Sequence, residues 1–392
     1  MSRLKNNFLD MEKDKLQIRD KVAQEKRQWV RLTRVCNNNC LFCLDKENQN
    51  GEIIPFRQVI DDFKNGRKEG ATRAILSGGE PTLHPQLIEI IKKAKKFGYS
   101  HIQMISNGRM LAYEDFVKKL KEAGLNEITL SLHSHLKDKF EEIVQAKGSY
   151  NQAIKGLLNA LKHNLIVSVD IVINKINYKT LKDTLNFFIK LGVTEFDLLH
   201  LVPFGNAWSN RKKIFYSPRQ AKKYLDKAFE LFKNKNLFIW TNRLPAIYLE
   251  GYEELIQHPI KLVDEVRGME NELRGYIGNN KTMFCFGKRC DYCFMNGFCS
   301  DLIKLKKEKI LKSKSVPFCF LGVLQQNKKS KIFKFKKNVN LYKFLDFYIK
   351  YRYFVKSFRC KNCRYFQKCD GANIEEIRIK GFRILKPFLK KQ

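Results

Sequence analysis

Three cysteines near the start of the chain have a spacing that suits an iron–sulfur cluster. Cys36, Cys40 and Cys43 lie in RLTRVCNNNCLFC, a C-x3-C-x2-C pattern. A [4Fe–4S] cluster normally takes four thiolates, so three thiolates leave one iron without a protein ligand. An iron of this kind can bind a substrate or cofactor, and the pattern therefore predicts chemistry. The alternative is a structural zinc site, which needs a fourth Cys or His ligand. The next such residue in the chain is the distant His84.

A second motif, SGGEPTLHP at 77–85, follows the second predicted strand. Gly78 and Gly79 permit a close approach of backbone. The Glu80 carboxylate can accept a hydrogen bond from a cationic amine. A plain strand-to-loop turn is the alternative interpretation, because Gly-Gly pairs are common in turns.

Together these motifs, with the aromatic Phe42 just before the last cysteine, resemble the signature of the radical S-adenosylmethionine (SAM) superfamily. The resemblance implies a [4Fe–4S] cluster on the three cysteines and SAM bound at its open iron. In similar proteins the GGEP segment, here Gly78, Gly79, Glu80 and Pro81, contacts the methionyl amine of SAM. Polar residues at later strand ends contact its carboxylate and ribose, and here these are Ser106, Asn107, Ser131 and Asn174.

Ordinary turn chemistry is the alternative for those polar residues, since Asn-Gly is a turn signal in its own right. His133 and His200 also lie at predicted strand ends. A lone histidine at such a place is more often a satisfied polar residue than a catalyst, so the sequence assigns no catalytic residue.

The other eight cysteines form an internal repeat in which a lone cysteine precedes Arg-Cys-x2-Cys-x5-Cys. The first copy has Cys285, Cys290, Cys293 and Cys299, and the second has Cys319, Cys360, Cys363 and Cys369. The region resembles the SPASM/twitch extensions of radical SAM enzymes, which implies two auxiliary Fe–S clusters. SPASM domains continue with another cysteine where this chain has Ile303 and Asn373. The sequence therefore does not decide which cysteines ligate which cluster. Two structural zinc ribbons are the alternative interpretation of the repeat.

The elements that must position these residues alternate between strands and helices. Aliphatic runs at 29–34, 71–78, 101–108, 127–133, 167–174 and 195–202 predict strands, and 237–245 is a candidate for one more. Helical patterns between them predict βαβ units and a parallel sheet in an α/β fold. The apolar character of the runs predicts that both sheet faces are covered. The resemblance implies a partial (β/α)6 TIM-type barrel, while alternation alone equally allows a doubly wound sheet. In both architectures ligands bind at the carboxyl ends of the strands.

The predicted organisation is a charged N-terminal segment (1–28), a radical SAM core (29–245), a bridging segment (246–284) and a small cysteine-rich C-terminal extension (285–392). No apolar run is long enough for a membrane span and no signal-peptide core is present. We therefore expect a soluble cytoplasmic protein without a membrane partner, where clustered cysteines favour metal ligation over disulfides.

The 392 residues carry a formal charge of +35. This charge is compatible with RNA binding. A general compositional bias towards lysine, without any binding partner, explains the charge equally well. The lysine-rich stretch 301–340 is the densest part. We expect an enzyme that cleaves SAM reductively to a 5′-deoxyadenosyl radical and abstracts hydrogen from its substrate, with oxidative modification of a peptide or protein as the leading expectation. A small-molecule substrate stays open, and we expect an external electron donor such as flavodoxin or ferredoxin. RNA modification is the alternative, and a non-catalytic metal-binding scaffold is the alternative of another class.

Overall fold

The computed structural model describes residues 21, 24–279, 282–283, 285–315, 317, 319, 330–336 and 338–389. The chain divides into two compact units, with the boundary between Arg243 and Leu244. Most of the charged N-terminal segment lies outside the described residues, as do residues 320–329 of the lysine-rich stretch. No helix in the described part of the chain has both the length and the apolar character needed to cross a membrane.

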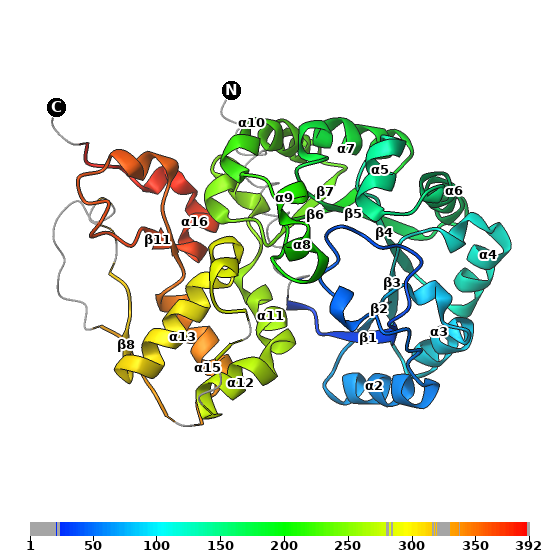
Figure 1. The fold of residues 1–392 in the computed structure, drawn as a ribbon, viewed down its shortest axis with the longest axis horizontal. Helices are drawn as coiled ribbons and strands as arrows, with labels where there is room; N and C mark the ends of the chain where they lie inside the picture. Colours follow the sequence, from blue (N-terminus) through cyan, green and yellow to red (C-terminus); the bar gives the residue numbers. More distant parts are fainter. Residues whose placement is uncertain are drawn as a thin grey trace, which may run out of the picture. The chain divides into compact units, whose positions relative to one another are not determined.

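The first unit contains a parallel sheet whose strands lie side by side in chain order (Figure 1). Its seven described strands are β1 (Arg27–Thr33), β2 (Arg73–Gly78), β3 (His101–Ser106), β4 (Glu127–Ser131), β5 (Ile166–Val172), β6 (Glu195–Leu199) and β7 (Phe238–Asn242). A doubly wound sheet reverses its strand order part of the way across, whereas a TIM-type wall does not. The predicted partial barrel is therefore confirmed, with 237–245 supplying the seventh strand.

Helices connect the strands, and most of them lie on the outer side of the sheet (Figure 1). They are α2 (Phe56–Lys68), α3 (Leu87–Lys96), α4 (Glu114–Ala123), α5 (Lys137–Val144), α6 (Ser149–Lys162), α7 (Leu181–Lys190), α8 (Gly205–Ser209), α9 (Arg211–Ile214) and α10 (Pro218–Phe229). The short helices α8 and α9 pack instead against the cysteine loop. The buried face of α3 is an apolar stripe made of Leu87, Ile90, Ile91 and Ala94. Burial of such a stripe is the main source of stability for an amphipathic helix.

The two faces of the sheet differ, which corrects the expectation that both are fully covered. Along β6, Phe196 and Leu198 are buried, while Glu195, Asp197 and Leu199 keep partial exposure. The same alternation occurs along β3 and β7. Side chains alternate between the faces of a strand, so one face packs under the helices and the other lines a partly open, polar interior.

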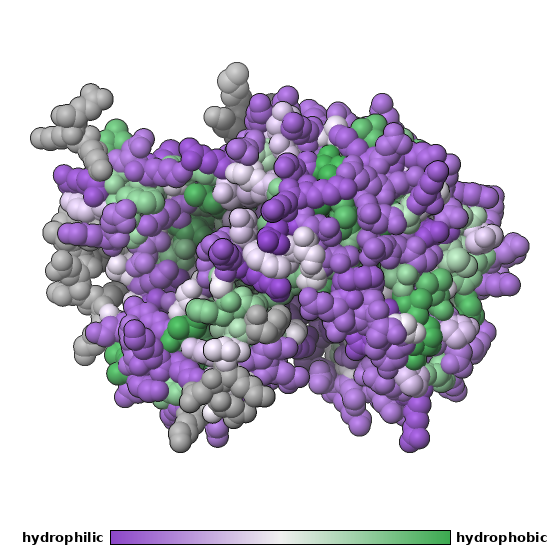
Figure 2. Space-filling model, in the orientation of Figure 1, coloured by the Kyte–Doolittle hydropathy of each residue, from purple (hydrophilic) through white to green (hydrophobic). Residues whose placement is uncertain are grey.

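The second unit has its own core. Its elements are α11 (Leu262–Gly268), α12 (Glu270–Asn279), α13 (Asn296–Glu308), β8 (Ile310–Lys312), β9 (Ile332–Lys334), α15 (Leu341–Tyr351), β10 (Phe354–Val355), β11 (Ala372–Asn373) and α16 (Ile374–Lys380). Phe298 of α13 packs against Phe344 of α15 at 5.3 Å between ring centroids. Nearby, Arg352 makes a buried bidentate pair with Asp301, at 2.5 and 2.7 Å. Around both units, the face seen in Figure 2 is largely hydrophilic, in keeping with the high charge.

Candidate active site

A cavity lies at the carboxyl ends of the strands of the first unit. Every strand contributes a lining residue at or beyond its end: Cys36 after β1, Gly78 on β2, Ser106 on β3, Ser131 on β4, Val172 on β5, Leu199 on β6 and Arg243 after β7. Because the strands are parallel, their ends meet on one side of the sheet. The fold therefore gathers into one place residues that are far apart in the sequence.

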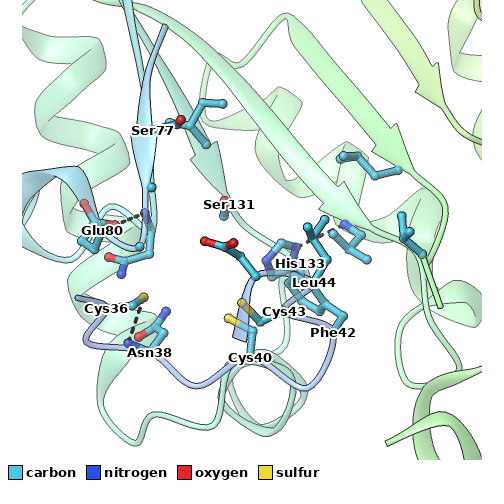
Figure 3. Close-up of a pocket in the computed structure, with 18 of the residues that line it drawn as sticks. Cys36, Asn38, Cys40, Phe42, Cys43, Leu44, Ser77, Glu80, Ser131 and His133 are labelled. Carbon is cyan, nitrogen blue, oxygen red and sulfur yellow. Dashed lines mark hydrogen bonds between the residues drawn. The ribbon is translucent and has the colours of Figure 1, made fainter. Parts of the chain in front are cut away.

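The three N-terminal cysteines line this cavity together. Figure 3 shows the sulfurs of Cys40 and Cys43 side by side, with the sulfur of Cys36 facing them across the space. Burial raises the pKa of all three thiols, and for Cys40 the neighbouring Cys36 and Cys43 raise it further. Without a metal these thiols are protonated. Because metals bind thiolates, metal binding here must displace protons.

Backbone hydrogen bonds hold the cysteine loop against the barrel. The Leu41 N–H donates to Ile143 O of α5 at 2.9 Å. On the other side, the Asn206 side chain of α8 donates to Cys40 O at 3.0 Å, and its backbone N–H donates to Cys43 O at 2.9 Å. Sequence reasoning missed Asn206, since no local signal links residues that are 166 positions apart.

The Gly-Gly-Glu segment supports the same loop from the side of β2. Gly79 N–H donates to Thr33 O and Glu80 N–H donates to Val35 O, both at 2.7 Å. A Cβ atom on Gly78 would lie 2.4 Å from Thr33 O, and one on Gly79 would lie 2.0 Å from Val35 O. The close backbone approach predicted for these glycines therefore exists, and it is made to the chain that leads into Cys36.

The Glu80 carboxylate ties the end of β2 to the end of β3. Its Oε1 atom accepts hydrogen bonds from Thr82 N (3.1 Å), Thr82 Oγ1 (2.6 Å) and Ser106 Oγ (2.8 Å), and its Oε2 atom accepts from Asn107 N at 2.7 Å. Burial raises the Glu80 pKa, while the hydrogen bonds from Asn107, Thr82 and Ser106 oppose that rise. Glu80 lines the cavity, and an ionised carboxylate only accepts hydrogen bonds, so it is a lining group that suits a cationic donor.

The remaining predicted contacts divide into two groups. Phe42 and Ser131 line the cavity, as do Ser106 and Asn107. Pro81 and Asn174 are outside its lining. The Asn174 amide is used by its own turn, where Nδ2 donates to Val172 O at 2.9 Å and Oδ1 accepts from Ile176 N at 2.9 Å.

Two histidines that the sequence did not assign also line the cavity. The His133 Nδ1 atom accepts from Val172 N at 3.3 Å, and its ring meets Phe42 edge to face at 4.6 Å between centroids. Burial lowers the pKa of His133 to about 3 and the pKa of His200 to about 4. Both rings are therefore neutral near pH 7. His200 is oriented by Tyr216, whose hydroxyl lies 2.9 Å from its Nδ1 atom.

The eight C-terminal cysteines lie in the second unit, four in each copy of the repeat. In each copy a short 3₁₀ helix, Lys288–Tyr292 or Phe358–Asn362, carries the first cysteine of the Cys-x2-Cys pair. Burial, together with the charges of its three partners in the first set, raises the pKa of Cys299 to about 12. Burial likewise raises the pKa of Cys360, as do its three partners in the second set. Mutual influence of this kind requires proximity within each set.

Among the described residues, no three His, Cys, Asp or Glu side chains converge closely enough to hold a single metal ion. The chemistry of the donor set nevertheless fits a [4Fe–4S] cluster with SAM. Three cysteine sulfurs face one cavity, and thiolates are the usual ligands of such clusters. Beside them, Glu80 lines the same cavity, and its carboxylate suits a cationic amine.

Fold and site thus define a partial β/α barrel with a three-cysteine centre at the carboxyl ends of its strands. Residues 30–188 match the family model described as the Radical SAM superfamily. The chain therefore carries a radical SAM domain, and the resemblance predicted from its motifs is confirmed. Proteins of this superfamily use a [4Fe–4S] cluster together with SAM.

Curated relatives match part of the chain. A "Probable GTP 3',8-cyclase" of Saccharolobus solfataricus is 33% identical over 178 residues, which are 45% of this chain and 57% of that protein. A protein of the same name from Sulfurisphaera tokodaii is 33% identical over 203 residues, which are 50% and 64% of the two chains. The chain thus spans less than two thirds of the length of these relatives. Among solved structures, SuiB of Streptococcus suis bound to SAM shows a weak likeness, with a TM-score of 0.48 and 15% identity over 91% of this chain and 75% of that chain.

Proposed function

We propose that this chain is a radical SAM enzyme that cleaves SAM reductively and abstracts hydrogen from a substrate in the cavity of its barrel. The observation that supports this most directly is the meeting of Cys36, Cys40, Cys43 and Glu80 in one cavity at the strand ends. When bound, a reduced [4Fe–4S] cluster and SAM supply a 5′-deoxyadenosyl radical, which takes a hydrogen atom from an unactivated carbon.

The residues of the chain then have distinct tasks. The three cysteines hold the cluster, and the Glu80 carboxylate receives the methionyl amine. Ser131 and the neutral His133 offer polar contacts in the cavity. The apolar side chains of Val172 and Leu199 line its wall at β5 and β6 and help to exclude water from the reacting atoms.

We also propose that each four-cysteine set of the second unit holds an auxiliary Fe–S cluster. Support comes from the sets themselves, in which four thiols influence one another within each copy of the repeat. Four thiolates satisfy an Fe–S cluster and equally satisfy zinc, so metal analysis must separate the two. We also propose the four-part organisation that the sequence predicts, with the cysteine-rich extension as the part that holds the auxiliary clusters.

For the substrate, GTP is the first candidate, because the curated relatives are named for it. Neither peptide modification, our leading expectation from the sequence, nor RNA modification gains support from these relatives. Since the match leaves more than a third of each relative uncovered, GTP belongs to this chain as a proposal.

The test is anaerobic reconstitution of the full-length chain, followed by reduction with dithionite in the presence of SAM. We expect 5′-deoxyadenosine by chromatography, its loss in Cys40→Ala, and faster formation when GTP is added. Close to twelve iron and twelve sulfide per chain would agree with three [4Fe–4S] clusters, by the arithmetic of four irons per cluster. Absence of 5′-deoxyadenosine from iron-loaded protein would favour the metal-binding scaffold. Acceleration by an acidic peptide or an RNA and not by GTP would reassign the substrate.

A further inference from the structure

We propose that Gln49 sets the reduction potential of the cluster held by Cys36, Cys40 and Cys43, through an N–H···S hydrogen bond to Cys43. The inference rests on the proposed function, since it requires a cluster at these cysteines. It adds a positioning and tuning role for a residue outside the motifs of the sequence.

The contact is direct. The Gln49 Nε2 atom lies 3.4 Å from Cys43 Sγ, and both residues line the cavity. Gln49 is half-buried and follows the short 3₁₀ helix Lys46–Asn48, where its backbone N–H donates to Lys46 O at 3.1 Å. The side chain thus reaches back over six residues to the last cysteine of the motif.

A second contact decides which end of the amide faces the sulfur. The Lys46 ammonium donates to Gln49 Oε1 at 3.3 Å. An ammonium has donors and no acceptor, so the amide oxygen must face Lys46. The NH₂ group then faces Cys43, and the interaction with sulfur is a donated hydrogen bond.

The turn that carries Gln49 is anchored to the barrel. The Asp45 carboxylate accepts from Arg31 Nη2 of β1 at 3.2 Å and from Asn48 Nδ2 at 2.8 Å. These contacts fix the turn from 45 to 49 to the first strand before any ligand binds. The amide is therefore held in place, and little side-chain entropy is lost when it donates to a thiolate.

The consequence for the cluster follows from charge. One-electron reduction makes the cluster and its thiolates more negative, so a donor aimed at sulfur stabilises the reduced state more than the oxidised state. Hydrogen bonds to the sulfurs are among the factors that set Fe–S potentials. Loss of the Gln49 donor should therefore move the potential to more negative values and make the cluster harder to reduce.

The test is a redox titration of the reconstituted full-length chain, monitored by electron paramagnetic resonance. The signal that changes when SAM is added identifies the cluster at Cys36, Cys40 and Cys43. We compare Gln49→Leu, which removes the donor, with Gln49→Glu, which also adds negative charge. The matched control is Gln220→Leu, the same change at an exposed position of α10.

We expect Gln49→Leu to lower the ratio of reduced to oxidised cluster at a fixed potential by up to about tenfold, which is about 59 mV for one electron. Gln49→Glu should lower it further, and Gln220→Leu should leave it unchanged. If Gln49→Leu does not assemble a cluster, Gln49→Met provides the test, because it removes the donor on an unbranched side chain of similar length and should give the same shift. Potentials equal to that of the parent in cluster-loaded variants would overturn the inference. Failure of the parent chain to form a SAM-responsive cluster would instead overturn the proposed function.

Discussion

Replacement of Glu80 should destabilise the barrel as well as weaken SAM binding. In Glu80→Ala the backbone N–H groups of Thr82 and Asn107 lose their acceptor, whereas the hydroxyls of Thr82 and Ser106 can rotate towards other acceptors. Each buried N–H left unpaired costs about 1–3 kcal/mol, so the variant should lose about 2–6 kcal/mol of folding stability. For a domain of this size that loss lowers the melting temperature by between about 5 and 20 °C.

Glu80→Gln separates the two roles of the carboxylate. Its amide oxygen can keep the donors on Oε1, but its NH₂ group then faces the donating Asn107 N–H. That one mismatch should cost about 1–3 kcal/mol. The matched control is Glu89→Ala, which removes an exposed carboxylate paired with Lys92 on α3 and should cost less than about 1 kcal/mol.

The assay combines thermal melting by circular dichroism with iron content and SAM affinity for each variant. We expect the melting temperature to fall from the parent to Glu80→Gln and further to Glu80→Ala, with Glu89→Ala close to the parent. The reasoning would be refuted if Glu80→Ala had the melting temperature and the iron content of the parent while its SAM affinity fell tenfold. Glu80 would then act as a ligand for SAM alone and not as a tie between two strand ends.

Of two further predictions, one concerns the packing that supports the site and the other a charged cluster at the amino ends of β2, β3 and β4. Gly79→Ala places a Cβ atom 2.0 Å from a backbone carbonyl oxygen and should prevent recovery of soluble protein. In the control Gly268→Ala the added Cβ atom meets nothing within 4 Å, so this variant should behave as the parent. Equal soluble yields of the two variants would contradict the steric argument. Burial raises the Glu127 pKa, but the His101 hydrogen bond and the Arg73 charge outweigh burial and lower it. The Glu127 carboxylate therefore stabilises the fold above its unfolded pKa, and this stabilisation is lost as the pH falls. Glu127→Gln should be less stable than the parent at pH 7 in urea unfolding and should show a flatter decline below about pH 5; parallel stability curves would contradict this assignment.

Local patterns in the sequence were sufficient to predict the elements and the class of the site. The stripe on α3 repeats with the period of a helix, and the run at 237–245 has the composition of a strand, so both were found without knowledge of their neighbours. The spacing of Cys36, Cys40 and Cys43 is also local, since all three lie in one loop. Alternation with helices predicted a parallel sheet, whereas the strand order that distinguishes a barrel from a doubly wound sheet is seen in the structure.

The tertiary structure decided which polar groups meet. Asn174, Ser106 and Ser131 all lie at or just after the ends of strands. The Asn174 amide is nevertheless used by its own turn, whereas Ser131 lines the cavity. Asn206 holds the carbonyl of Cys40 from a helix 166 positions away. Both faces of the strands were expected to be covered, and the observed alternation shows a polar interior. A hydrogen-bond partner is chosen by proximity and orientation in space, and a shift of one residue along a strand turns a side chain to the opposite face.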